Sequence, residues 1–252
     1  MKIIISEAYK KQEQIIRQAI EDFESGGEVF IKGPRNTIKL FPLGEKQMNI
    51  KSFKVPNAVN KIAYRFFRKS KAQRSFQYAH TLVTRGIGTP YPIAFAEENG
   101  GVLFGKSYYI SEHQESDLTY RTLVQEPEYP DFENILRAFT RFTYSLHENH
   151  IEFLDHSPGN TLIQAGEEGY KFFLVDLNRM NFRKLDFDAR MKNFSRLTYK
   201  KEMVAIMANE YSRIYSKTEE EVFEKMWFYT QDFQAKFSRK RELKKKLKFW
   251  KK

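Results

Sequence analysis

Apolar positions follow two different spacings along the chain. Through residues 6–23 they recur at helical spacing, and the pair Gly26 and Gly27 then provides a stop. Short runs rich in β-forming residues follow, separated by turn residues, at positions 28–32, 37–41, 48–53, 92–97 and 102–111. This pattern predicts a small antiparallel sheet of five strands, preceded by a helix.

Helical spacing dominates the remainder of the chain. Helices are predicted for residues 57–67, 70–85, 119–124, 132–150, 188–199, 201–216 and 219–236. A sheet followed by helices predicts a two-lobed α+β protein. We expect a small antiparallel-sheet N-lobe in residues 1–112, a mainly helical C-lobe in residues 113–237 and a tail in residues 238–252.

Composition narrows the class of protein. The 252 residues are 41% hydrophobic and 15% aromatic, which is typical of a folded chain rather than a disordered one. The chain has no cysteine, which excludes disulfides, thiolate metal sites and a cysteine nucleophile. The first residues turn polar too early for a signal peptide, and no apolar run is long enough to span a bilayer. We therefore expect a cytoplasmic protein.

The formal net charge is +11, which favours phosphate-rich partners: nucleic acid, anionic lipid or a phosphorylated glycan. Much of this charge lies in residues 238–252, where Lys and Arg alternate with Leu243, Leu247, Phe249 and Trp250. Such a basic helix with an aromatic pair is typical of a segment on an anionic membrane surface. A solubilising tail remains the alternative, and nucleic-acid binding fits this composition less well.

One polar segment in the helical half has a pattern associated with phosphoryl transfer. Asp155 is followed by Asn160 five residues later, by an apolar strand, and by Asp176 after a second apolar strand. In this pattern the first Asp accepts or orients the proton of the acceptor hydroxyl, while the Asn and the second Asp hold Mg²⁺. The turn at residues 164–169 would bring Asn160 and Asp176 to one end of a hairpin. The alternative is a polar turn before a hairpin.

The predicted sheet contains candidates for nucleotide binding. The turn Gly33-Pro34-Arg35-Asn36 could place backbone N–H groups and an arginine over an anion, although a simple hairpin turn is the alternative. Lys51 occupies the strand position from which kinases reach the nucleotide phosphates. Lys54 is the alternative and would point to the opposite side of the pleat. Both lysines could also be solvated residues of an edge strand.

Five motifs, in this order and spacing, resemble those of one enzyme family; they occupy residues 33–36, 71–75, 86–94, 155–160 and 175–180. Over residues 28–182 the chain resembles the bacterial lipopolysaccharide kinase family, which includes the Kdo and heptose kinases of the inner core and has a protein-kinase-like fold. The resemblance implies ATP as donor and the lipopolysaccharide core, a membrane-embedded glycolipid, as acceptor. It thus implies a cytoplasmic enzyme that is peripheral at the inner membrane.

The resemblance also implies roles for individual residues. Asp155 would be the catalytic base, Asn160 and Asp176 would bind Mg²⁺, and Lys51 would bind the nucleotide phosphates. The strand that ends at Glu112 resembles the one leading into the hinge, whose backbone would meet the adenine.

Two positions depart from the kinase pattern. Phe153 stands where kinases have a histidine before the catalytic Asp, and Gln77 stands where a glutamate would pair with Lys51. Glu97 is an alternative acidic partner for this lysine. Two other functions therefore stay open: a kinase-like phosphotransferase acting on a protein or a soluble small molecule, and a non-catalytic pseudokinase that binds anionic lipid or nucleic acid.

Overall fold

The computed structural model describes residues 1–34, 36–54, 69–100 and 103–249. The chain divides into two compact units, Met1–Glu115 with Phe173–Arg179, and Ser116–Phe172 with Met180–Lys252. Asp176 therefore belongs to the unit that the N-terminal residues form, although it lies far along the chain. The helix predicted for residues 57–67 falls outside the described residues.

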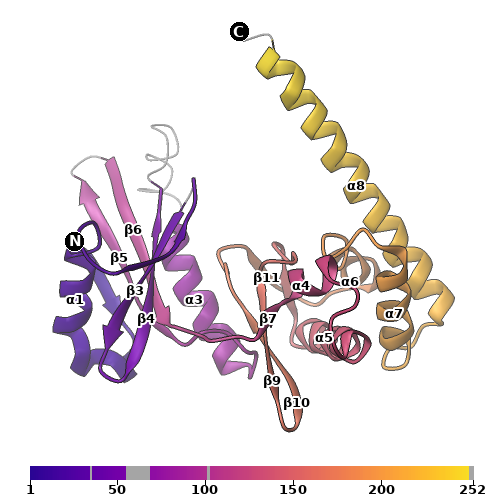
Figure 1. The fold of residues 1–252 in the computed structure, drawn as a ribbon, viewed down its shortest axis with the longest axis horizontal. Helices are drawn as coiled ribbons and strands as arrows, with labels where there is room; N and C mark the ends of the chain where they lie inside the picture. Colours follow the sequence, from indigo (N-terminus) through magenta and orange to yellow (C-terminus); the bar gives the residue numbers. More distant parts are fainter. Residues whose placement is uncertain (35, 55–68, 101–102, 250–252) are drawn as a thin grey trace. The chain divides into compact units, whose positions relative to one another are not determined.

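In the first unit, six strands of the described chain form one antiparallel sheet in the order β1-β5-β6-β4-β3-β2 (Figure 1). The strands are β1 Lys2–Ile5, β2 Glu28–Lys32, β3 Asn36–Leu43, β4 Lys46–Phe53, β5 Pro92–Gly100 and β6 Leu103–Glu112. The sequence predicted five of them. It missed β1, because four residues are too few to show alternation, and β1 forms only by pairing with β5 at the sheet edge.

Helices cover both faces of this sheet (Figure 1). The predicted helix at residues 6–23 is divided into η1 Glu7–Gln12 and α1 Glu13–Glu21. Ile16 and Ile20 of α1 pack in one apolar cluster with Met48 and Ile50 of β4. On the other face, α3 Lys71–Thr84 packs Ala72 and Phe76 against Phe53 and Phe95. Side chains alternate along a strand, so Lys51, which follows Ile50, points away from α1.

The second unit is mainly helical in its described residues. Its helices are α4 Tyr120–Gln125, α5 Phe132–Glu148, α6 Phe187–Asn193, α7 Lys201–Ser212 and α8 Glu219–Phe249. Its strands are β7 Leu118–Thr119, β8 Ile151–Phe153, β9 Thr161–Gly166, β10 Gly169–Leu174 and β11 Met180–Phe182, in the orders β10-β9-β7 and β11-β8. The helix predicted for residues 219–236 continues through the basic segment as α8, while α6 ends earlier than predicted.

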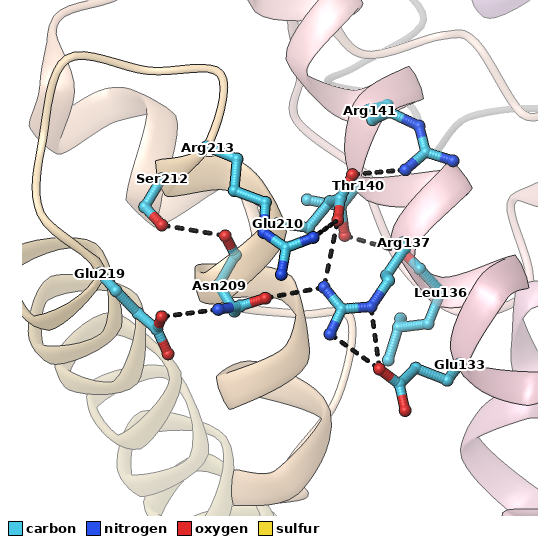
Figure 2. A network of polar contacts seen from close by, with 10 residues as sticks. All are labelled: Glu133, Leu136, Arg137, Thr140, Arg141, Asn209, Glu210, Ser212, Arg213 and Glu219. Atoms are coloured by element: carbon cyan, nitrogen blue, oxygen red, sulfur yellow. Dashed lines mark hydrogen bonds and ion pairs between the residues drawn. The ribbon is translucent and has the colours of Figure 1, made fainter.

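A polar network joins α5, α7 and α8 within this unit (Figure 2). Glu210 of α7 is only 7% exposed and pairs with Arg141 and with Arg137, whose Nη1 lies 3.1 Å from Oε2. Arg137 Nη1 also donates to Asn209 Oδ1 at 2.8 Å, and Asn209 Nδ2 donates to Glu219 Oε2 at 2.6 Å. Glu210 thus ties α7 to α5, and Asn209 extends the network to α8, all in the unit that contains Asp155.

Replacement of Glu210 by Gln is expected to lower the free energy of unfolding by about 2–3 kcal/mol at pH 7, because it removes the charge of a buried carboxylate that pairs with Arg137 and Arg141. Burial raises the pKa of Glu210, but hydrogen bonds from Arg141 and Arg137 outweigh it and lower the pKa below the usual value. The stabilisation is therefore present above the unfolded-state pKa and is lost as the pH falls through the folded-state pKa.

Urea unfolding at pH 7 and at mildly acidic pH measures the difference in free energy of unfolding between the wild type and Glu210→Gln. The control is Glu133→Gln, which removes an exposed i,i+4 partner of Arg137 and is expected to lower the stability by at most about 0.5 kcal/mol. An equal effect of the two substitutions, or a difference that does not shrink on acidification, would show that Glu210 does not stabilise the unit in this way.

Candidate active site

Lys51 and Asp176 form an ion pair within the first unit. Lys51 Nζ lies 2.6 Å from Asp176 Oδ1, although 125 residues separate the two along the chain. The lysine side chain is 13% exposed and also lies over the Phe53 ring, 5.3 Å from its centroid. β4 presents this lysine on the face of the sheet opposite α1. The structure thus brings together a lysine and an aspartate that the sequence pattern had singled out separately.

Hydrogen bonds hold the segment that carries Asp176 in the first unit. The Leu174 N–H donates to Gly88 O at 2.9 Å, and Thr89 Oγ1 donates to Leu174 O at 2.8 Å. Asp176 itself has a φ of 59°, in the left-handed region that residues other than glycine seldom adopt. Asn178 Nδ2 donates to Asp176 Oδ1 at 2.8 Å. Backbone strain of this kind concentrates at functional sites.

Opposing effects set the charge of Asp176. Burial raises the pKa of Asp176, but the attraction of Lys51 and the hydrogen bonds from Lys51 and Asn178 outweigh it, so the pKa lies below its usual value. The positive charge of Lys71 on α3 lowers the pKa further. The carboxylate is therefore ionised at neutral pH, which is the form that binds metal ions.

Lys54, the alternative to Lys51, and Gln77, at the position of its expected partner, lie in other environments. Lys54 follows the end of β4 and is exposed. Gln77 of α3, which stands where a glutamate was expected, accepts a hydrogen bond from Lys69 Nζ at 2.9 Å through its Oε1. Asp176 therefore supplies Lys51 with the negative charge that Gln77 lacks.

The turn between β2 and β3 is tight. The Gly33 N–H donates to Asn36 O at 3.0 Å, and a Cβ at Gly33 would lie 3.3 Å from that same oxygen. Asn36 begins β3 opposite Phe53 of β4. Arg35 lies outside the described residues. The contribution of this turn to nucleotide binding stays a prediction.

Glu112 ends β6 with its side chain on the face of α1, because it pairs with Met48, which packs against α1. Its carboxylate accepts hydrogen bonds from Tyr9 and from Lys46 Nζ, the latter at 2.8 Å, and its N–H donates to Tyr91 O at 2.9 Å. These four residues line a pocket of ≈ 590 Å³. The Glu112 side chain is thus on the other face from Lys51, and a contact of the hinge backbone with adenine stays a prediction.

Residues 155–160 of the second unit form a loop that its own hydrogen bonds close. Asn160 donates from Nδ2 to Asp155 O at 2.8 Å and from its N–H to Ser157 O at 2.9 Å. A Cβ at Gly159 would lie 2.4 Å from Arg121 Nη2, so a larger residue here would displace this guanidinium from the loop. The structure thus places Asp155 and Asn160 in one turn directly before β9.

Asp155 is 16% exposed, and its Oδ1 pairs with Arg196 Nη1 at 2.7 Å. The neighbouring His156 is buried between the rings of Phe139 and Phe153, whose centroids lie 5.4 and 5.7 Å away. Burial lowers the pKa of His156 to about 3, so this ring is neutral and enclosed at physiological pH. Asp155 is therefore the better candidate for a proton acceptor at this point of the chain.

Sequence reasoning missed two residues of these clusters. Asn178 lies within the motif at residues 175–180, and its spacing of two from Asp176 was the available signal. Arg196 carries no such signal, because it is 41 residues from Asp155 and lies in a stretch predicted to be helical. α6 instead ends at Asn193 and leaves Arg196 beyond the helix.

The fold is that of protein-kinase-like proteins. A solved structure described as WaaP in complex with acyl carrier protein matches 95% of this chain and 99% of that chain, with a TM-score of 0.63 and 14% sequence identity. This match confirms the predicted α+β, kinase-like fold. No curated protein matches the sequence.

The sequence matches the Lipopolysaccharide kinase (Kdo/WaaP) family over residues 53–218, and the chain belongs to that family. The match begins after Lys51 and the Gly33 turn, and it extends further toward the C-terminus than the resemblance at residues 28–182. Membership confirms the predicted family and makes the protein a kinase of lipopolysaccharide biosynthesis, with ATP use and a glycolipid substrate implied. It also decides for an enzyme over a non-catalytic pseudokinase.

Proposed function

We propose that the protein transfers the γ-phosphoryl group of ATP to a hydroxyl of Kdo or heptose in the inner core of lipopolysaccharide. The Lys51–Asp176 ion pair carries the proposal, because it joins the phosphate-binding lysine of a kinase to its metal-binding aspartate. Lys51 neutralises nucleotide phosphates, and Asp155 orients the acceptor hydroxyl and accepts its proton. Such catalysis needs positioning and charge neutralisation and no covalent intermediate.

Asn160 and Asp176 have donor atoms that suit Mg²⁺, which prefers oxygen ligands. Within the described ranges of the chain, both side-chain hydrogen bonds to Asp176 end on Oδ1, which leaves Oδ2 for a cation. Asn160 uses Nδ2 in its bond to Asp155 O, which leaves its Oδ1 for the same purpose. Bound Mg²⁺ would neutralise charge on the phosphate oxygens.

The described residues hold no group of three or more His, Asp or Glu side chains that could bind a metal. Magnesium in kinases usually takes one or two carboxylates together with substrate phosphates, so the single carboxylate of Asp176 beside the amide oxygen of Asn160 fits this use. Gly33, Arg35 and Asn36 would cover the phosphates, and the backbone at Glu112 would contact the adenine.

Two measurements test the proposal. The first is calorimetric titration of ATP into the protein, with and without Mg²⁺, and the second is an assay of phosphoryl transfer to purified inner-core glycolipid. We expect binding that depends on Mg²⁺ and transfer to the glycolipid. Absence of nucleotide binding in both conditions would overturn the assignment of Lys51 and Asp176. Binding with transfer only to proteins or soluble sugars would leave the kinase site and exclude the proposed acceptor.

The proposal places the enzyme on the cytoplasmic surface of the inner membrane, held there by residues 238–252. Residues 235–246 of α8 are exposed, including the apolar side chains of Phe237 and Leu243, at 55% and 60%. None of the helices in the described ranges has the length and hydropathy needed to cross a membrane. A basic helix with exposed apolar side chains binds anionic bilayers through burial of its apolar side chains and through electrostatic attraction to the anionic lipid.

Deletion of residues 238–252 is expected to lower transfer to glycolipid in anionic vesicles by about 10-fold or more, because each basic residue near the surface contributes about 1 kcal/mol to binding. The same deletion should leave transfer to detergent-dispersed acceptor unchanged. Cosedimentation and activity, each with vesicles that contain or lack anionic lipid, measure both effects. An equal loss with the two forms of acceptor would show that the tail acts on the enzyme rather than on membrane binding.

A further inference from the structure

Arg196 connects Asp155 to the long helix α8. Its Nη1 lies 2.7 Å from Asp155 Oδ1 and 3.0 Å from Leu154 O, so one guanidinium nitrogen holds both the side chain and the neighbouring backbone of the loop. On its other side, the guanidinium carbon lies over the ring of Phe233, 5.6 Å from the centroid. Phe233 belongs to α8. All four residues lie in the second unit.

This arrangement fixes the guanidinium by three kinds of contact. The ion pair and the carbonyl bond orient one edge, and the aromatic ring restrains the plane. Arg196 Nε is buried with no hydrogen-bond partner among the described residues, which leaves Nη1 to carry the contacts with the loop. Lysine could reproduce the charge, but it lacks the flat group that can stack on Phe233 while bonding to two oxygens.

We propose that Arg196 is a positioning residue for the phosphoryl transfer, and that α8 sets its position through Phe233. The inference rests on the proposed role of Asp155. Arg196 occupies Oδ1 and thereby fixes the rotation of the carboxylate, which decides where the acceptor proton is received. A displacement of about 1 Å at a reacting group can lower a rate by about 10²-fold. The contact also joins Asp155 to the helix whose far end is the basic tail.

The first test replaces Arg196 by Met, which keeps an apolar stem next to Phe233 and removes the guanidinium. We expect kcat to fall about 10- to 100-fold while KM for ATP and for the glycolipid stays within about twofold, because orientation is lost and binding is not. Arg196→Lys should recover part of the loss. The control Arg213→Met removes another partly exposed arginine of this unit, 3.7 Å from Glu210, and should leave kcat unchanged.

The second test separates the contribution of α8. Phe233→Leu keeps an apolar side chain and removes the aromatic face, and it should lower kcat about 3- to 10-fold. Phe228→Leu is the matched control on the same helix, since Phe228 is 60% exposed and its ring packs on Tyr229. A kcat for Phe233→Leu equal to that of the control would overturn the role of α8, and Arg196 would act alone.

Failure of this inference can be told from failure of the proposed function. In an Asp155→Asn background, Arg196→Met should cause no further loss, because residues acting through one group are not additive. If Asp155→Asn alone retains activity, the proposed function fails. If Asp155→Asn is inactive while Arg196→Met keeps native kcat, only the inference fails. If Arg196→Met does not fold, the single variants Arg196→Lys and Phe233→Leu replace it in this test. A native kcat in both of them would overturn the inference equally.

Discussion

Replacement of Asp155 by Asn is expected to lower phosphoryl transfer by about 10³-fold or more, because a positioned proton acceptor contributes about 10²- to 10⁴-fold and Asn accepts no proton. Asn also keeps an Oδ1 that can receive the hydrogen bond from Arg196 Nη1. Asp155→Ala should be as inactive. It also removes the acceptor of the hydrogen bond from Arg196, so the Asn variant is the cleaner test of chemistry.

The fold should survive both substitutions, because Asp155 lies on a loop that other contacts close. Asn160 bonds to the backbone oxygen of Asp155, and His156 packs between two rings irrespective of the neighbouring side chain. Asp188→Asn is a matched control in the same unit, since Asp188 is ion-paired with Lys225 at 2.9 Å and is half exposed. Near-native turnover of Asp155→Asn, at unchanged ATP affinity, would remove Asp155 from the proposed role.

Local spacing was enough to predict most of the sheet and to single out the candidate residues of both clusters. Asp155 and Asn160 are five residues apart, and the hydrogen bonds that close their loop join residues within it. The strands β2 to β6 likewise have apolar patterns and turns that are visible in the sequence. In each case the signal and the structure involve neighbouring residues, so a single sequence suffices.

Features that depend on distant partners were missed. β1 is a strand only because β5 supplies its hydrogen bonds, and the Glu112 side chain lies on the α1 face because of the register with Met48. Arg196 reaches Asp155 only after α6 ends at Asn193. No period or motif in the sequence encodes these pairings, because register and helix ends are decided by tertiary packing.

Replacement of Asp176 by Asn is expected to abolish the part of ATP affinity that depends on Mg²⁺ and to lower transfer by about 10²-fold or more, because a neutral amide attracts Mg²⁺ much less strongly than the carboxylate that it replaces. The pKa of Asp176 lies below its usual value, so the wild-type carboxylate stays ionised throughout the neutral range. The effect of Mg²⁺ should therefore show little change between pH 6 and pH 8, roughly the range in which unperturbed carboxyl groups are fully ionised.

Titration of ATP without Mg²⁺ distinguishes metal binding from a purely structural role of this residue. Asp176→Asn frees Lys51 from its 2.6 Å ion pair, so the lysine should meet the nucleotide phosphates at least as readily as in the wild type. ATP alone should then bind the variant as tightly as the wild type or more tightly, while the gain on adding Mg²⁺ disappears. A variant that binds ATP less tightly both with and without Mg²⁺ would instead mean that Asp176 holds Lys51 in place, and the metal ligand would have to be sought elsewhere.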